Sequence, residues 1–335
     1  MSSKQSPICF KCLFRFAQVF IALITTTRQR ISKATDFRMN QPFFTTSRGA
    51  LFDTDCLEIL RGLKSGVVDT IFADPPFNIG KDYKNGYNDR VSQSEYMKWC
   101  REWIEQCCRV IKPGGAFFLY ATPELAVQFS PIMGESLNFR HWISVTMKGT
   151  FPRGKKLYPA HYALLYYTRG VPRVFNKLRL PIETCRHCGK EIRDYGGHRN
   201  KMNPEGVNLS NVWTDTSPNR HRKFKVRSGV NELKLIIPER AILISTEPGD
   251  LVFDPFGGGG STFQAAEKHN RNWVGTELYD SAHIRKRIEE EFSFSAALEP
   301  EFDTTDLFIH EDKQNQVLRR VEREGMSART GTYIS

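Results

Sequence analysis

Residues 69–78 read DTIFADPPFN. Its first half is apolar and β-branched, which predicts a buried strand. The two prolines end that strand, because neither can donate to a sheet ladder and each keeps the preceding residue extended. The sequence therefore predicts a stiff loop at the carboxyl end of a strand, where open α/β sheets place their ligands.

The predicted loop offers the carboxylate of Asp74, backbone carbonyls and the flat ring of Phe77. This combination suits a planar amine, because the oxygens can accept its hydrogens while the ring stacks on it. Taken alone, the stretch also fits a strand end whose acid faces water. A second motif has to decide between these interpretations.

That second motif is LVFDPFGGGGST at residues 251–262. It predicts a strand, a run of four glycines and the start of a helix. Glycines between a strand and a helix let backbone amides approach a ligand closely. The next predicted strand, 273–276, ends in Glu277. This acid follows Gly260 by 17 residues, near the ~20 expected for a carboxylate that binds a ribose diol.

The remaining pattern predicts an α/β fold. Strands are expected at 50–53, 69–73, 116–121, 251–254 and 273–276, and helices at 56–63, at 94–111 with Ser94 as the cap, at 231–246 and at 262–268. Strands that alternate with helices favour parallel pairing and right-handed crossovers. The runs 141–148 and 162–168 predict an antiparallel hairpin at the edge of this mostly parallel sheet.

The charge of the chain is concentrated in one region. The 335 residues carry a formal charge of +11, with 40% hydrophobic and 25% charged residues, as in ordinary globular proteins. Residues 169–240 hold 16 Lys and Arg against 7 Asp and Glu. Such a basic block predicts a polyanionic partner, most simply nucleic acid. A basic face that only serves solubility is the alternative.

The eight cysteines are scattered, which favours reduced thiols in a cytoplasm over a secreted disulfide scaffold. Cys185 and Cys188 form half of a zinc knuckle, but no second pair with this spacing exists. Because a structural zinc site needs four ligands, two free thiols are favoured over structural zinc at this pair. Separately, no metal ion is expected at the functional site.

The two ends of the chain fit the core pattern poorly. The apolar run 8–24 is interrupted by Lys11 and Arg15 and is followed by no convincing cleavage site. It predicts neither a membrane span nor a signal peptide. The sequence instead favours Met39 as the natural start and residues 1–38 as an extension. Residues 293–335 form a tail to which the sequence assigns no function.

Together, the Asp-Pro-Pro-Phe motif, the basic block after it and the Asp-Pro-Phe-Gly-Gly-Gly-Gly motif resemble the amino-DNA methyltransferases. Their order resembles the permuted β group, in which the catalytic motif precedes the cofactor motif. The resemblance implies a Rossmann-like sheet that binds S-adenosylmethionine. It divides the chain into a catalytic half (39–168), an inserted target-recognition region (169–230) and a cofactor-binding half (231–292).

The resemblance also assigns site residues. The catalytic motif corresponds to Asp74, Pro75, Pro76 and Phe77, and the cofactor site to Asp55, Asp254, Phe256, Gly258, Gly260 and Glu277. Asp53 competes with Asp55 for its assignment. Two patterns of the family are absent: a Lys-Pro before the cofactor-side helix, and a Trp-x-Lys on the antiparallel strand, where Val145-Thr146-Met147-Lys148 stands. These departures concern the rim of the cofactor pocket.

The implied reaction is direct methyl transfer to an exocyclic amine of a base flipped out of double-stranded DNA. Asp74 and the carbonyl of Pro75 would accept the amine hydrogens, and Phe77 would stack on the base. Asp before Pro-Pro favours N6 of adenine, as in site-specific adenine methyltransferases, over N4 of cytosine. Rival interpretations are an RNA or protein methyltransferase and a non-enzymatic DNA-binding protein. A homodimer and a cognate restriction endonuclease are further partners that the resemblance allows.

Overall fold

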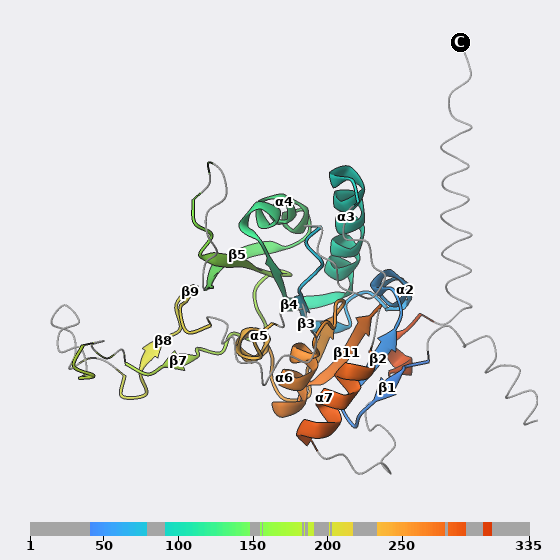
Figure 1. Ribbon diagram of the computed structural model, residues 1–335. Coiled ribbons are helices and arrows are strands. Elements are labelled where there is room, and N and C mark those ends of the chain that lie inside the picture. The colour runs from blue at the N-terminus through green and yellow to red at the C-terminus, as the bar shows by residue number, and fades with distance from the viewer. Residues whose placement is uncertain are drawn as a thin grey trace, which may run out of the picture. The chain divides into compact units, whose positions relative to one another are not determined.

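The computed structural model describes residues 41–78, 91–147, 155, 157–182, 184, 187–190, 201, 203–216, 233–278, 281–292 and 304–309. Their helices and strands all lie in the unit Phe43–Ser335 (Figure 1). The predictions for residues 1–38 and for most of the tail concern residues outside these described ranges. Within the described part of the chain, no helix combines the length and apolar character that crossing a membrane requires.

The described part of the chain forms one nine-stranded sheet in the order β1-β2-β11-β10-β3-β4-β6-β5-β9. The strands are β1 (Phe44–Thr45), β2 (Gly49–Asp53), β3 (Val68–Ala73), β4 (Ile111–Ala121), β5 (Asn138–Thr146), β6 (His161–Thr168), β9 (Val212–Trp213), β10 (Leu251–Asp254) and β11 (Asn272–Glu277). From β2 to β4 all neighbours are parallel, whereas β6 is antiparallel to both β4 and β5.

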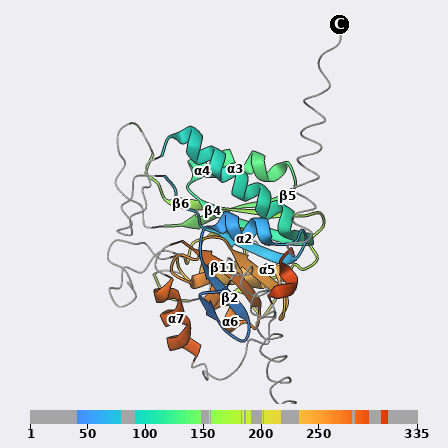
Figure 2. The same ribbon diagram turned by 90° about the vertical axis from the view of Figure 1, so that its right-hand side faces the viewer.

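Helices cover both faces of this sheet (Figures 1 and 2). One face carries α2 (Cys56–Gly62), α3 (Gln93–Val110) and α4 (Pro123–Gly134), and the other α5 (Ile236–Ser245), α6 (Ser261–Lys268) and α7 (Ala282–Phe292). Outside the sheet lie the short pair β7 (Arg179–Leu180) and β8 (Val207–Asn208) and the single turn η4 (Thr305–Leu307).

The central strand β3 explains why the layers form. All six of its residues are buried. Ile71 and Ala73 pack into the core under α2, α3 and α4, and Phe72 packs into the core under α5. A strand buried on both faces needs the continuous apolar run that the sequence has here. The predicted α/β sheet, mostly parallel with an antiparallel pair, is confirmed.

The antiparallel pair is not the outermost element, because β9 adds a short parallel strand beyond β5. This strand comes from the basic region. Its turn is tied to α5, since Arg240 donates to Asp215 across 2.8 Å and its guanidinium lies 5.3 Å from the Trp213 ring centroid. The described end of the basic region is therefore fixed to α5.

Three element boundaries differ from the sequence prediction. Ser92, not Ser94, caps α3, because Ser92 and Glu95 form a reciprocal capping box. Helix α5 begins at Ile236 rather than at 231. Strand β4 begins at Ile111, before Pro113, and its pairing steps from Ile111 opposite Val68 to Ala116 opposite Thr70. Residues 112–115 therefore bulge out of the ladder, which leaves the proline without a strand partner.

Candidate active site at the strand ends

Strands β3 and β10 are neighbours at the point where the chain changes direction across the sheet. Their parallel register pairs Ile71 with Phe253. After β3 the sheet continues to β4 on one side, and after β10 it continues to β11 on the other. The carboxyl ends at such a switch point are where α/β sheets bind ligands. The structure therefore brings the Asp74 loop and the glycine loop, far apart in sequence, to one site.

The loop after β3 is held from two sides. The hydroxyl of Tyr96 in α3 donates to the carbonyl of Pro76 across 2.7 Å. Asn78 has a positive φ of 53°, and its amide pairs with the backbone of Val91 in both directions, at 3.0 and 3.1 Å. Pro75 is buried, whereas Asp74 stays half-buried at the front of the loop. These contacts fix the loop's path and give Asn78 a structural role.

Two tyrosines that the sequence analysis missed complete this side of the site. The rings of Phe77 and Tyr162 lie 6.1 Å apart at 33°, and those of Tyr120 and Tyr162 lie 5.0 Å apart. Burial raises the pKa of both tyrosines, and the nearby charge of Asp74 raises it further. Three aromatic rings thus stand beside one carboxylate. No sequence signal marks Tyr120 and Tyr162, because they meet only through the antiparallel pairing of β4 and β6.

The loop after β10 is held by its own backbone. The Gly257 amide donates to the Thr276 carbonyl and the Gly258 amide to the Glu277 carboxylate, both across 2.7 Å. Gly260 has a φ of 78° and precedes α6 directly. A Cβ at Gly260 would meet the Ile284 side chain at 3.0 Å. The glycines are thus required both by conformation and by the close approach of α7.

Asp254 lies behind the glycine loop. It is 2% exposed and accepts hydrogen bonds from the Phe256 amide, at 2.8 Å, and from Thr262. Burial raises its pKa well above the ordinary range, and the charges of Asp74 and Glu277 act in the same direction. The carboxyl therefore braces the loop from within the core.

Phe256, the aromatic residue of the same loop, is half-buried against α3. Its ring centroid lies 5.7 Å from that of Trp99 and 5.0 Å from that of Trp103. Helix α3 thus contacts the loop after β10 through these tryptophans, as it contacts the loop after β3 through Tyr96.

The two acids after β2 have separate structural positions. Asp55 caps α2 and accepts the Leu57 amide at 2.7 Å. Asp53 is exposed, stands opposite Glu277 in the register of β2 and β11, and accepts a hydrogen bond from Ser281 at 3.1 Å. The structure therefore brings Asp53 next to the glycine-loop acid and gives Asp55 a helix-capping role.

No group of three or more His, Cys, Asp or Glu side chains suited to a metal ion occurs in the described ranges. Cys188 is exposed and free. The zinc question also involves Cys185, which lies outside the described residues.

Residues 68–284 match the family model of the DNA methylases of the N6/N4 type. The chain is 48% identical over 250 residues to the type II methyltransferase M.BamHI of Bacillus amyloliquefaciens, covering 74% of this chain and 59% of that protein. It is 31% identical over 241 residues to the type II methyltransferase M.BglII of Bacillus subtilis, covering 68% and 65%. The chain thus spans less than two thirds of either relative.

Two solved structures share the fold. The PvuII DNA methyltransferase, described as cytosine-N4-specific, has a TM-score of 0.52 at 17% identity and covers 84% of this chain and 95% of its own. Protein TTHA0409 of Thermus thermophilus has a TM-score of 0.50 at 16% identity and covers 73% and 95%. The expected methyltransferase fold and the resemblance to amino-DNA methyltransferases are confirmed. Because the family model covers more than half of the chain, this protein belongs to the N6/N4 DNA methylase family.

Proposed function

We propose that this protein transfers the methyl group of S-adenosylmethionine to an exocyclic amine of a base in double-stranded DNA. The observation that carries the proposal is the meeting of two loops at one switch point. One presents a half-buried carboxylate among aromatic rings, and the other presents glycine amides beside Glu277. The family to which the chain belongs supports the same chemistry.

The loop after β10 is the proposed cofactor site. Gly258 and Gly260 both have positive φ values, and a Cβ added at Gly258 would meet only the Phe256 carbonyl, at 3.6 Å. Glu277 can accept hydroxyl hydrogens of a ribose, and Phe256 forms part of the wall. Asp55 and Asp254 are part of the same proposed cofactor site. Asp55 acts through its cap on α2, and Asp254 acts by bracing the glycine loop. When bound, the cofactor supplies an electrophilic sulfonium methyl.

The loop after β3 is the proposed base site. An exocyclic amine is a poor nucleophile because its lone pair is delocalised into the ring. Asp74 would accept one amine hydrogen and the carbonyl of Pro75 the other, which favours a tetrahedral nitrogen with an available lone pair. Pro76 fixes the loop. Positioning and charge stabilisation then account for catalysis without a covalent enzyme intermediate.

Flipping the base out of the duplex costs a few kcal/mol. Stacking on Phe77 would recover about 1–3 kcal/mol, and Tyr162 stands beside Phe77 to extend that surface. The rings therefore offset the cost of exposing the amine to Asp74.

The proposed base is adenine, methylated at N6, with cytosine N4 as the alternative. Asp before Pro-Pro favours adenine by resemblance to adenine-specific enzymes. The E. coli K12 relative YhdJ, which is 26% identical over 72% of this chain and 83% of its own, is named a DNA adenine methyltransferase. The oxygens of the loop act on an amine that both bases carry, so cytosine fits the same chemistry.

The basic region is the proposed contact to DNA, as part of a division into a catalytic half (39–168), a target-recognition region (169–230) and a cofactor-binding half (231–292). Its cations would neutralise phosphates, and its amides and guanidinium groups would reach base edges. We also propose that the protein forms a homodimer and that it has a cognate restriction endonuclease as a partner. Light scattering tests the first, and a search of the neighbouring genes tests the second.

The decisive test is expression in a host that lacks DNA methylation, followed by base-resolved sequencing of the host DNA. A defined sequence carrying N6-methyladenine, absent when Asp74→Ala is expressed at equal level, is expected. N4-methylcytosine in its place would support the same reaction on the alternative base. Unmodified DNA in cells holding folded protein that binds S-adenosylmethionine would contradict methyl transfer. Folded protein that binds DNA but takes up no cofactor would support the non-enzymatic alternative.

A further inference from the structure

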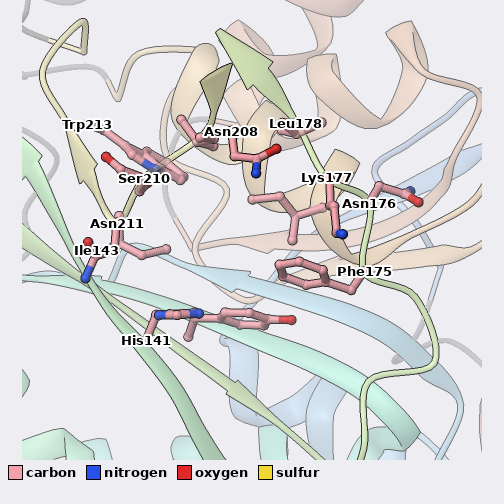
Figure 3. A pocket seen from close by; sticks show the side chains of 13 residues that line it. His141, Ile143, Phe175, Asn176, Lys177, Leu178, Asn208, Ser210, Asn211 and Trp213 are labelled. Atoms are coloured by element: carbon pink, nitrogen blue, oxygen red, sulfur yellow. Dashed lines mark hydrogen bonds between the residues drawn. The ribbon is translucent and has the colours of Figure 1, made fainter. Parts of the chain in front are cut away.

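A cavity lies away from the strand-end site, on the face of the sheet that carries α5. Its volume is about 250 Å³, and it lies between β5 and β6 on one side and the segments around residues 175–178 and 208–213 on the other (Figure 3). Tyr166 in its floor follows Tyr162 by four positions on β6. At ~3.3 Å per residue the two tyrosines are ~13 Å apart along one face of the sheet.

The floor of this cavity contains a polar group without a partner. Tyr166 is 2% exposed, and its hydroxyl has no hydrogen-bond partner in the described part of the chain. Its ring stacks on Phe118, with centroids 4.4 Å apart, so the side chain is fixed. Burial raises the pKa of Tyr166 to about 12, so the hydroxyl keeps its proton at neutral pH. A buried donor without a partner costs free energy that an acceptor entering the cavity would recover.

The rest of the floor is formed largely by aromatic rings. Trp213 is 1% exposed, and its indole nitrogen already donates to the Ser210 carbonyl across 2.9 Å. His141 is the register partner of Tyr166, and the two rings are nearly parallel, at 19°. Such a surface accepts a planar ring better than a bulky aliphatic group.

The rim is exposed and carries the polar groups. Phe175 is 53% exposed, and Lys177 and Asn208 are exposed around the same opening. Figure 3 shows Phe175 and Lys177 on the segment that faces His141 across the cavity. Aromatic rings stack on bases, amides pair with base edges, and a lysine neutralises a phosphate.

We propose that this cavity binds one nucleobase together with its phosphate, supplied by a DNA strand that has lost its stacking there. The ring would rest on the floor and against Phe175, the Tyr166 hydroxyl and the Asn208 amide would bond to its edge, and Lys177 would contact the phosphate. In naming DNA as the source, the inference rests on the proposed function.

DNA is favoured over a free nucleotide by the position of the cavity. Phe175, Lys177 and Asn208 belong to the basic stretch that begins at residue 169, and the spacing of ~13 Å from Tyr162 equals about four base steps of a duplex strand. DNA held at the strand-end site therefore extends over the distance to this cavity. A free mononucleotide would satisfy the same chemistry, so the experiment separates the two sources.

Two binding measurements on the full chain test the inference, and neither needs the recognition sequence. The first uses a fluorescently labelled single-stranded oligodeoxynucleotide of mixed sequence, whose bases are already free to unstack. The second uses calorimetry with the four deoxynucleoside monophosphates. Phe175→Ala is expected to weaken oligonucleotide binding about tenfold through lost stacking, and Tyr166→Phe about fivefold through one lost hydrogen bond.

Matched controls come from the same strands. Phe139→Ala removes a ring that is 54% exposed on β5 and lies outside the cavity. Tyr167→Phe removes the neighbouring hydroxyl, which pairs with Ser130 at 2.6 Å in the other core. Both controls are expected to change oligonucleotide affinity by less than about twofold.

The outcomes separate the sources and the proposals. If Phe175→Ala weakens binding of the monophosphates, whereas the oligonucleotide does not bind or binds without responding to the change, the ligand is a free nucleotide and the DNA source is wrong. If neither probe distinguishes the cavity variants from the controls, the inference is overturned, even where methyl transfer is intact. If oligonucleotide binding responds while host DNA stays unmodified, the cavity assignment stands and methyl transfer fails.

Discussion

The loops after β3 and β10 start at neighbouring strand ends but are held in different ways. The loop after β3 is stiffened by prolines and anchored through side chains, namely the Tyr96 hydroxyl and the Asn78 amide. The loop after β10 is anchored through backbone amides of its glycines. The first keeps the carboxylate of Asp74 half-buried, whereas the second is preceded by Asp254, the last residue of β10, which lies in the core.

This difference fits the two tasks that we propose for the loops. A group that acts on an amine has to present a charged oxygen at the surface of a loop that does not move. A surface that receives a large cofactor needs backbone within reach and side chains out of the way. Substitutions in the first loop should therefore impair transfer, and substitutions in the second should impair cofactor binding.

The largest expected effect is that of Asp74→Ala on methyl transfer. Loss of this carboxylate removes the acceptor for one amine hydrogen, and the rate should fall by about 10²–10³ or more. Transfer of tritiated methyl groups to DNA under single-turnover conditions measures it. Glu105→Ala, which removes an exposed acid on α3, is the control and should keep the wild-type rate. A rate within about twofold of wild type for Asp74→Ala would show that the loop does not act on the base.

Next in size is Gly260→Ala. Its φ of 78° is unfavourable for alanine by about 1–2 kcal/mol, and the new methyl group would meet Ile284 at 3.0 Å. Affinity for S-adenosylmethionine should fall about tenfold or more, as measured by calorimetry. Gly249→Ala is the matched control, because its φ is 87° but nothing lies within 4 Å of the added Cβ. Equal losses of affinity in both variants would indicate general strain rather than a cofactor loop.

A smaller effect is expected for Tyr96→Phe. The change removes the hydrogen bond to the Pro76 carbonyl and keeps the buried ring. Looser positioning of Asp74 should lower the transfer rate about fivefold, in line with one neutral hydrogen bond. Affinity for S-adenosylmethionine should not change, since the contact belongs to the loop after β3. A loss confined to cofactor affinity would reverse the division between the loops.

The smallest expected effect is a change in the pH dependence of stability for Asp254→Asn. Burial raises the folded-state pKa of Asp254, so the folded state binds more protons than the unfolded state. The stability of the wild type therefore falls as pH rises from the unfolded value of about 4 through the raised pKa. Asparagine does not titrate and keeps an acceptor for the Phe256 amide. Urea unfolding at several pH values should show that the free energy of unfolding of the variant rises relative to that of the wild type as pH rises. A relative rise on acidification would contradict the burial argument.

The sequence predicted both loops because each is a dense local signal. Asp-Pro-Pro-Phe and the glycine run specify backbone over a few residues, and each follows an apolar strand. Ser92 was missed because only the position of Glu95 distinguishes it from Ser94 as a cap. Helix α4, which begins with Pro123 after the Thr122 cap, was not predicted although this start signal is present.

Contacts between strands that are distant in the chain could not be predicted from the sequence. Tyr120 and Tyr162 meet because β4 and β6 pair antiparallel with one particular register, and no local pattern specifies a register. The same holds for Asp53, which stands opposite Glu277 only once β2 and β11 are paired. The cavity around Tyr166 likewise forms from segments separated in the chain, so its residues carry no joint signal.

The most direct test of the division between the two loops is calorimetric titration of S-adenosylmethionine into Asp74→Ala beside the wild type. If the loop after β3 serves the base and the loop after β10 serves the cofactor, the variant should bind the cofactor within about threefold of the wild-type affinity while its methyl transfer is lost. A loss of cofactor affinity as large as that of Gly260→Ala would contradict the account, because Asp74 would then belong to the cofactor site.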